Sequence, residues 1–309
     1  MTIESTIIAL AGKEFAAKVA EISLKKLAGD ASTRNYFRVV GGEKSLIACY
    51  YPDLRDSLER SVEFSGFLLK NGIPVNRLLS VDKERGIVLI EDLGDEQLYG
   101  LKGEPWEILE PKLQEGLELL AKINALPFHE LKTVAAPFDI DFWIWELRLF
   151  TKYYLGEMRG ITDSTKIIEQ IRAILSIYGK YGAVFSHRDY HSKNLMLNHG
   201  EMFVIDYQDA RGGPVEYDLA SFLRDAYLKI PEEIELRLLK HFFDISGQSD
   251  YTDFLHRYYR ISVQRSLKAV GTFAYQAVER KNKSYLKYIE NSLNNAIDAA
   301  QKTGFSLDL

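Results

Sequence analysis

The most informative stretch of the chain reads Ser186-His187-Arg188-Asp189-Tyr190-His191-Ser192-Lys193-Asn194. An apolar run over residues 202–205 comes soon after it, and Asp206 directly follows that run. Kinases use an Asp, an Asn five residues later and a second Asp after a strand to orient an acceptor hydroxyl and to hold Mg²⁺ on ATP. The spacing therefore predicts phosphoryl transfer, with ATP and Mg²⁺ as cofactors.

The residue types suit three separate tasks in that chemistry. Mg²⁺ takes hard oxygen ligands and keeps several waters, so the Asn194 amide and the Asp206 carboxylate are its predicted ligands. Asp189 then remains for the acceptor hydroxyl, as a positioning group or general base. His187 stands two residues before this Asp, and we expect it to brace the loop by hydrogen bonding rather than to move protons.

Composition sets wider limits on the protein. The 309 residues with 46% hydrophobic content can bury a large core and divide into two lobes. The net charge of -5 argues against a nucleic-acid partner. Cys49 is the single cysteine, which excludes an internal disulfide. The sequence has neither a long apolar run nor a basic, then apolar, N-terminal segment. We therefore expect a cytoplasmic protein with no membrane partner.

Two patterns of hydrophobic residues follow one another along the chain. The first part is rich in short β-type runs, with Gly41-Gly42 as a hairpin turn, and one helical stripe over residues 56–71 ends at Gly72. The predicted strands cover residues 21–27, 36–40, 45–51 and 86–90. Helical periodicity dominates from Pro105 onward. These predicted helices cover residues 106–126, 141–155, 166–181, 232–243, 255–270 and 283–300.

This order of elements predicts an α+β, protein-kinase-like fold with two lobes. A small antiparallel sheet with one helix would form the N-lobe, residues 1–93, and would cover the nucleotide. A larger helical C-lobe, residues 94–309, would carry the catalytic loop and the acceptor site. The sequence gives no indication of the oligomeric state.

Three motifs carry a specific resemblance. The loop at 186–194, the segment Ile205-Asp206-Tyr207-Gln208-Asp209-Ala210 and the segment 213–220 resemble the aminoglycoside phosphotransferase and choline kinase superfamily. Within it, residues 29–39 and the segment Leu89-Ile90-Glu91-Asp92-Leu93-Gly94 are similar to the branch of bacterial N-acetylmuramate/N-acetylglucosamine anomeric kinases, which act in cell-wall recycling. The resemblance covers residues 29–225, most of the chain.

The resemblance implies roles for residues at matching positions. It makes Asp189 the catalytic base, and Asn194 and Asp206 the metal ligands. The turn over residues 29–35 would cover the ATP phosphates, and the backbone around residues 91–93 would bind adenine. The implied nucleotide contacts are Ser32, Thr33, Arg34, Glu91 and Leu93.

One position departs from the kinase pattern. Kinases place a lysine in the third strand to pair the α- and β-phosphates, and alignment of residues 47–50 with that strand puts Tyr50 there. Arg34, Arg38 or Lys44 would have to compensate. The alternative is a catalytically impaired nucleotide-binding protein.

The acceptor is expected to be a small molecule. Only residues 207–213 separate Asp206 from Pro214 and a new helix, whereas a protein kinase needs a long activation segment there. The resemblance favours a small sugar acceptor, phosphorylated at its anomeric hydroxyl. An aminoglycoside or choline-like acceptor is the alternative, and a polycationic one would need a strongly acidic pocket. The candidate substrate contacts are Asp209, Tyr190, Glu146 and Arg148.

Overall fold

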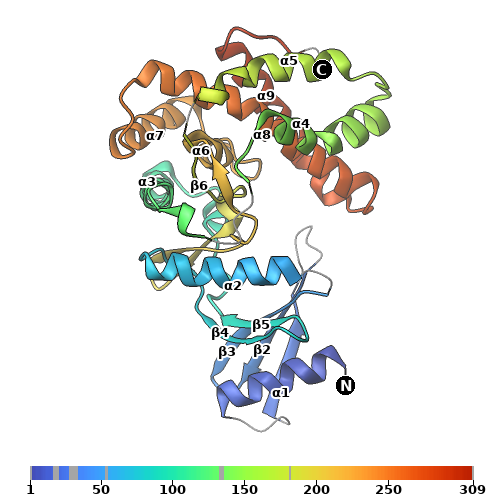
Figure 1. Ribbon diagram of the computed structural model, residues 1–309, viewed down its shortest axis with the longest axis vertical. Helices are drawn as coiled ribbons and strands as arrows, with labels where there is room; N and C mark the ends of the chain where they lie inside the picture. Colours follow the sequence, from blue (N-terminus) through green and yellow to red (C-terminus); the bar gives the residue numbers. More distant parts are fainter. Residues whose placement is uncertain are drawn as a thin grey trace. The chain divides into compact units, whose positions relative to one another are not determined.

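The computed structural model describes residues 2–16, 21–27, 34–52, 55–131, 136–180 and 182–307. The chain forms two compact units (Figure 1). Unit 1 contains residues 1–96, 129–133 and 196–209, and unit 2 contains residues 97–128, 134–195 and 210–309. The chain therefore leaves unit 1, and later returns to it with a short segment that ends at Asp209.

Unit 1 is built on a five-stranded antiparallel sheet in the order β1-β2-β3-β5-β4. The strands are β1 (Ile22–Lys26), β2 (Asn35–Gly41), β3 (Lys44–Tyr50), β4 (Leu78–Asp82) and β5 (Ile87–Glu91). The β2–β3 hairpin turns at Gly42, whose φ of +64° suits glycine. The expected small sheet is confirmed, although β4 was not predicted from the sequence.

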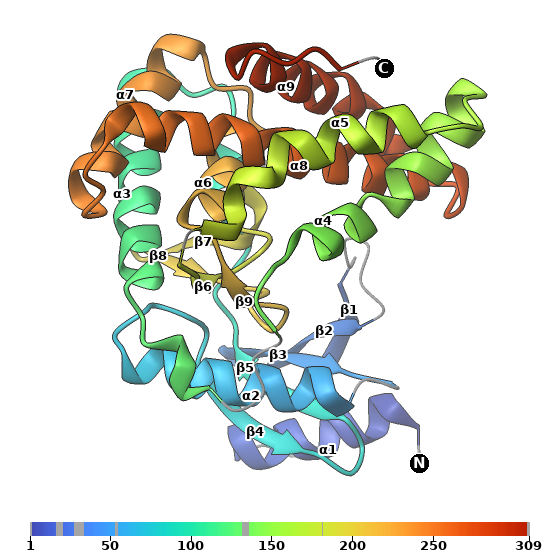
Figure 2. The same cartoon turned by 45° about the horizontal axis from the view of Figure 1, so that its top comes forward.

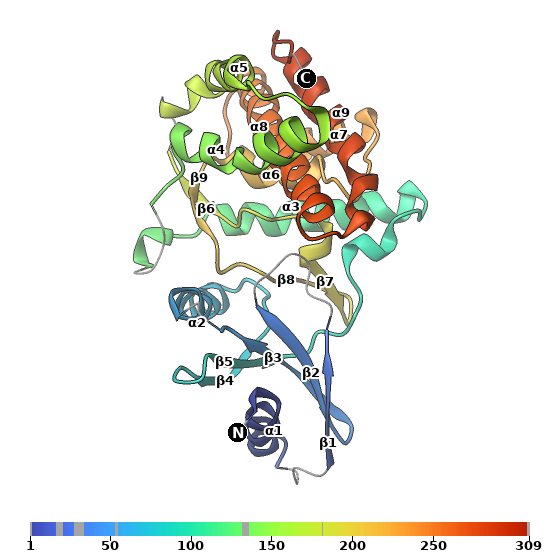
Figure 3. The ribbon, with the colours of Figure 1, turned by 90° about the vertical axis from the view of Figure 1, so that its right-hand side faces the viewer.

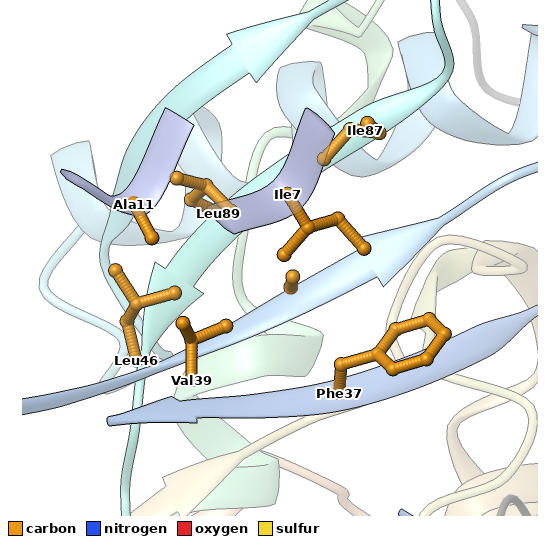
Figure 4. Close-up of a cluster of buried hydrophobic side chains, with 8 residues drawn as sticks. Ile7, Ala11, Phe37, Val39, Leu46, Ile87 and Leu89 are labelled. Atoms are coloured by element: carbon orange, nitrogen blue, oxygen red, sulfur yellow. The ribbon is translucent and has the colours of Figure 1, made fainter. Parts of the chain in front are cut away.

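Helices cover the two faces of this sheet (Figure 3). α1 (Ile3–Phe15) was not predicted; its N-cap is Thr2, whose side chain accepts a hydrogen bond from the Ser5 N–H. Ile7 and Ala11 of α1 pack on one face of the sheet with Val39, as Figure 4 shows. The predicted helix over residues 56–71 is α2 (Arg55–Lys70), and it packs on the opposite face.

The returning segment joins unit 1 through backbone contacts. β7 (Leu195–Asn198) and β8 (Glu201–Val204) form a two-stranded sheet. The Val204 N–H donates to the Pro74 carbonyl at 2.9 Å, and the Leu197 N–H donates to the Glu96 carbonyl at 2.8 Å. These contacts place Asp206, just beyond β8, in the same unit as the sheet.

Unit 2 is mainly helical, as the sequence predicts. The long helix α8 (Tyr251–Val278) is largely buried and packs against α6, α5 and α9, as Figure 2 shows for the last two. The other helices are α3 (Trp106–Asn124), α4 (Ile140–Glu146), α5 (Thr165–Leu175), α6 (Val215–Leu223), α7 (Glu232–Ile245) and α9 (Ile289–Lys302). None of the described helices is long and apolar enough to cross a membrane.

One predicted helix of unit 2 is interrupted. In place of a continuous helix over residues 141–155, α4 ends at Glu146 and a π-helix, η4 (Phe150–Met158), follows. Gly271 of α8 lies against η4 so closely that an added Cβ would be 2.3 Å from the Phe150 nitrogen. Periodicity alone could not show this break, because the apolar pattern continues through it.

Candidate active site

The predicted catalytic loop lies in unit 2 between two short paired strands, β6 (Val184–Ser186) and β9 (Arg211–Gly213). Asp218, in the first turn of α6, accepts hydrogen bonds from the backbone N–H of His187 at 2.6 Å and of Arg188 at 2.9 Å. Arg188 has a φ of +77°, a conformation that a non-glycine residue rarely adopts without support. Asp218 supplies that support through its two hydrogen bonds.

His187 also has the geometry expected of a brace. Its Nδ1 accepts a hydrogen bond from the Asp189 backbone N–H at 3.3 Å, and only 1% of its surface is exposed. The ring therefore contacts the backbone of Asp189.

The Asp189 carboxylate is reached by two cations from α8. Arg265 Nη2 lies 3.3 Å from Asp189 Oδ1, and Lys268 Nζ lies 3.8 Å from the same oxygen. Burial alone would raise the pKa of Asp189, but Lys268, Arg265 and Arg188 together hold that pKa well below its usual range. Asp189 is thus ionised and partly exposed, with 39% of its side-chain surface open.

Asn194 ends the loop in the short 3₁₀ turn η6 (Ser192–Asn194). Its side-chain Nδ2 donates to the Asp189 carbonyl at 2.8 Å, and the Ser192 N–H donates to Asp225 Oδ2 at 2.9 Å. These bonds fix the turn. They also orient the Asn194 amide so that its nitrogen faces the loop and its oxygen is the atom that can meet a ligand.

Glu146, predicted as a substrate contact, is enclosed by protein groups. Its Oε1 accepts from Arg188 Nη2 at 2.7 Å and lies 3.1 Å from Lys268 Nζ. Its Oε2 accepts from the Tyr217 hydroxyl at 3.2 Å and from Gln264 Nε2 at 3.1 Å. With 4% of its surface exposed, Glu146 is positioned to orient Arg188 and Lys268, and we no longer propose it as a substrate contact.

Tyr190 also faces the interior. It is fully buried, and its hydroxyl donates to the Gly116 carbonyl at 2.7 Å. Burial raises the pKa of its phenol well above the usual value. Because its side chain is buried in the core, Tyr190 cannot contact a substrate in this structure, and its predicted role as a substrate contact is wrong.

Aromatic residues of α4 divide between core and surface. Trp143 is buried, whereas Trp145 is 52% exposed and packs against Phe142 in a tilted arrangement, with 5.4 Å between ring centroids. Arg148 lies over the Trp145 ring at 3.5 Å, and its Nη1 donates to the Trp145 carbonyl. Arg148 thus remains a surface candidate for contact with an acceptor.

Asp206 and its neighbours form a second cluster, in unit 1. Arg34 Nη2 lies 2.8 Å from Asp206 Oδ1, and the Arg34 side chain is only 8% exposed. Gln208 Nε2 donates to the same Asp206 oxygen at 3.0 Å. Asp206 has a φ of +69°, so here too a strained backbone holds a predicted functional residue. Asp209 pairs with Arg60 of α2 at 3.9 Å.

The third strand shows where the sequence alignment needs correction. Side chains alternate between the faces of a strand, and Tyr50 packs with the cluster on the α1 face. Cys49 is on the other face, directly opposite Tyr36 on β2. Burial raises the pKa of the Cys49 thiol to about 12, and the charges of Arg34 and Asp206 also act on it. Cys49, rather than Tyr50, therefore lies on the face of β3 whose side chains interact with Arg34.

The segment after β5 is fixed by Arg38. Its guanidinium contacts Asp92 at 2.7 Å and Asp95 at 2.8 Å, and donates to the Gly94 carbonyl at 3.0 Å. The Glu91 N–H donates to the Arg77 carbonyl at 2.9 Å and is therefore already bonded within unit 1. Leu93 is buried. Ser32 and Thr33 lie outside the described residues.

Two site residues were not predicted from the sequence: Arg265 and Lys268. They are one turn apart on α8 and face Asp189 and Glu146 of other elements. Their sequence signal was that they are the two charged residues of the stretch 261–270, which does not identify a partner.

Comparison with known sequences shows relatives along most of the chain. A relative from Pseudomonas aeruginosa, named N-acetylmuramate/N-acetylglucosamine kinase, is 31% identical over 257 residues, which are 79% of this chain and 74% of the relative. One from Neisseria meningitidis with the same name is 28% identical and covers 82% of this chain and 78% of its own.

Solved structures agree on the fold. A choline kinase from Streptococcus pneumoniae has a TM-score of 0.68 at 13% identity, covering 96% of this chain and 99% of its own. An ADP-bound aminoglycoside phosphotransferase has a TM-score of 0.63 at 14% identity, with the same coverage of 96% and 99%. The two-lobed kinase-like fold class is thereby confirmed. The model of the phosphotransferase enzyme family matches residues 23–253, and the chain belongs to this family.

Proposed function

We propose that the protein transfers the γ-phosphoryl group of ATP to the anomeric hydroxyl of N-acetylmuramate or N-acetylglucosamine. The observation that carries the proposal is the Asp189 carboxylate, which is ionised, partly exposed and oriented by the braced loop. The shared name of relatives at 25–31% identity supports the choice of sugar.

Asp189 would accept a hydrogen bond from the acceptor hydroxyl and orient its oxygen toward the γ-phosphorus. Arg265 and Lys268 lower the pKa of this carboxylate, which makes it a weak base. Its contribution is therefore mainly to position the hydroxyl, and to take the proton late, as the bond to phosphorus forms. That fits phosphoryl transfer, in which the nucleophile needs little activation in a loose transition state.

Asn194 and Asp206 stay our proposed ligands of a magnesium ion, by the chemistry of their donor atoms. The Asn194 amide oxygen and the Asp206 carboxylate are hard oxygen ligands. Within the described parts of the chain, no group of three or more His, Cys, Asp or Glu side chains could hold a metal. Phosphate oxygens and waters would thus complete the shell. Bound there, Mg²⁺ would neutralise charge on the transferring phosphoryl group.

Arg34 is our candidate for the missing third-strand lysine. Of the three compensating residues expected from the sequence, Arg34 contacts Asp206, Arg38 is bound to the segment after β5, and Lys44 is exposed at the hairpin end. On ATP binding, the Arg34 guanidinium would leave Asp206 and donate its N–H groups to phosphate oxygens. Phosphate oxygens accept such paired hydrogen bonds as well as a carboxylate does. This favours an active enzyme over an impaired one.

The surroundings of Asp189 argue against an aminoglycoside or choline-like acceptor. A polycation needs an acidic pocket, yet the described groups that reach Asp189 are the cations of Arg265 and Lys268. Like charges about 4 Å apart cost roughly 1 to 4 kcal/mol, depending on exposure to water. A neutral or anionic sugar meets no such penalty.

We also propose that one lobe covers the nucleotide and the other binds the sugar. Residues 1–93 would cover the nucleotide, with Ser32, Thr33 and Arg34 near the phosphates and with Glu91 and Leu93 near adenine. Residues 94–309 would bind the sugar, and Asp209 and Arg148 stay candidates for contacts to it.

A ³¹P NMR assay of ATP with each sugar tests the function, because an anomeric phosphate is distinct from a 6-phosphate. We expect an anomeric phosphate resonance that grows as ATP is consumed. A 6-phosphate product would refute the assigned hydroxyl. Absence of any turnover with both sugars would refute the assigned acceptor class.

A further inference from the structure

Three cations, Arg188, Arg265 and Lys268, gather around the carboxylates of Asp189 and Glu146. Glu146 Oε1 is shared between Arg188 and Lys268, and Asp189 Oδ1 is shared between Arg265 and Lys268. In these contacts three cations share two carboxylates. These cationic side chains are only 11–18% exposed, and charges so far from water are costly unless anions meet them.

Lys268 has a remaining capacity to bind. An ammonium group has three N–H donors. Among the described residues, Nζ is within hydrogen-bonding distance of Glu146 Oε1 at 3.1 Å and of the Tyr217 hydroxyl at 3.2 Å, while Asp189 is farther away at 3.8 Å. The two closer contacts use two of the three N–H groups, and the 3.8 Å between Nζ and Asp189 Oδ1 is too long for a hydrogen bond.

The location of this donor indicates which ligand it serves. Asp189 is the group that we assign to the acceptor hydroxyl, so cations that touch its Oδ1 border the acceptor and not the adenine. Burial lowers the pKa of the Lys268 ammonium, while Asp189 and Glu146 raise it. A further anion beside Lys268 would strengthen its charged form.

We propose that Lys268, supported by Arg265, binds a carboxylate carried by the acceptor sugar, so that the site prefers a carboxylate-bearing amino sugar over its uncharged counterpart. The inference rests on the proposed function and deepens it. N-acetylmuramate has such a carboxylate, on its lactyl ether, and N-acetylglucosamine lacks it. The uncharged sugar would still bind through its ring and hydroxyls, with lower affinity.

The unmodified enzyme provides the first test. We would measure kcat/KM for N-acetylmuramate, for its methyl ester and for N-acetylglucosamine under identical conditions. Loss of a hydrogen-bonded charge predicts a reduction of about 10- to 100-fold for the ester relative to the acid. Equal values for acid and ester would overturn the carboxylate site while leaving the sugar kinase function intact. Turnover of none of the three would instead overturn the proposed function, and the inference with it.

Lys268→Met then tests the residue. We expect kcat/KM to fall for both sugars, because Lys268 also acts on Asp189, and to fall about 10-fold more for the acid than for N-acetylglucosamine, with partial recovery of the acid preference in Lys268→Arg. Lys240→Met, at an exposed lysine of α7, is the matched control and should leave the preference unchanged. Equal losses for both sugars would show that Lys268 only positions Asp189. If Lys268→Met does not fold, Arg265→Gln, assayed with the same pair of sugars, answers the question, and an unchanged preference there overturns the proposal.

Discussion

Asp189 and Asp206 are both carboxylates beside cations, but the two are held in different ways. In unit 2, Asp189 is contacted by Arg265 and Lys268. His187 accepts from its backbone N–H, and Asp218 holds the backbone of the two preceding residues. In unit 1, Asp206 is paired with a single arginine, Arg34. The first arrangement keeps the Asp189 carboxylate ionised and fixed in position. The second holds a carboxylate by one ion pair and a hydrogen bond from Gln208, contacts that a metal and a nucleotide can replace.

This difference gives the two carboxylates distinguishable tasks. A group that orients an acceptor should affect turnover and leave nucleotide binding unchanged. A group that binds the metal should affect Mg-ATP binding first. Each of the following substitutions separates the two clusters.

Asp189→Asn should have the largest effect. The amide keeps the shape of the side chain but loses the charge that orients and deprotonates the hydroxyl, so kcat should fall by about 10²- to 10⁴-fold. The Kd for ATP, measured by calorimetry, should stay within about 2-fold. Asp141→Asn, at a carboxylate that is 83% exposed in an ion pair with Arg172, is the matched control. A nearly normal rate in Asp189→Asn would show that the base is wrongly assigned.

Asp206→Ala should weaken Mg-ATP binding by about 100-fold, because it removes a carboxylate ligand of the metal. The diagnostic comparison is calorimetry with and without Mg²⁺. Binding of metal-free ATP should change little, and removal of the Arg34 ion pair could even improve it. A similar loss in both conditions would indicate a structural role for Asp206 rather than metal binding.

The catalytic loop could be predicted because its functional groups are close in sequence. Asp189 and Asn194 are fixed by local hydrogen bonds within residues 187–194, and residue types at short spacing carry that information. Arg265 and Lys268 could not be predicted in the same way. Arg265 is 76 residues from Asp189, and helical periodicity says that a face is buried without saying what it faces.

The sheet shows a second limit of prediction from sequence. The strands β1, β2, β3 and β5 follow alternating or apolar runs, and their existence was predicted. Which face each residue occupies depends on register, and a shift of one residue moves a side chain to the other face. That is why Tyr50 was aligned with the lysine position although Cys49 occupies the relevant face. α1 was missed because its cap, Thr2, and its apolar residues form a short and weakly amphipathic pattern.

Arg34→Met should raise the KM for ATP by about 10-fold, since it removes a charge-assisted contact to phosphate. Arg38→Met should have a smaller effect, about 3-fold or less, because Arg38 contacts the segment around Asp92 and Gly94 instead. Lys44→Met, at the exposed hairpin end, should have none. Steady-state kinetics with varied ATP ranks the three. An effect of Arg38→Met equal to that of Arg34→Met would contradict Arg34 as the substitute for the lysine.

Arg265→Gln should have the smallest effect, visible mainly in the pH dependence of kcat/KM for uncharged N-acetylglucosamine. Asp189 must be ionised to accept the hydroxyl proton, and its pKa is held low against burial by Lys268, Arg265 and Arg188. Activity of the native enzyme should therefore persist into acid until the pH approaches that low pKa. Without the Arg265 charge the pKa of Asp189 rises, so the acid limb should move up by about one pH unit.

The position of the acid limb separates this role from a structural one. Arg265→Lys keeps the charge near Asp189 and should restore much of the native pH profile. If Arg265→Gln instead lowers kcat/KM by the same factor at every pH, then Arg265 only supports the packing of α8 through its bond to Ser221. In that case Lys268 would be the main cation at Asp189, and the contrast with the single arginine at Asp206 would largely disappear.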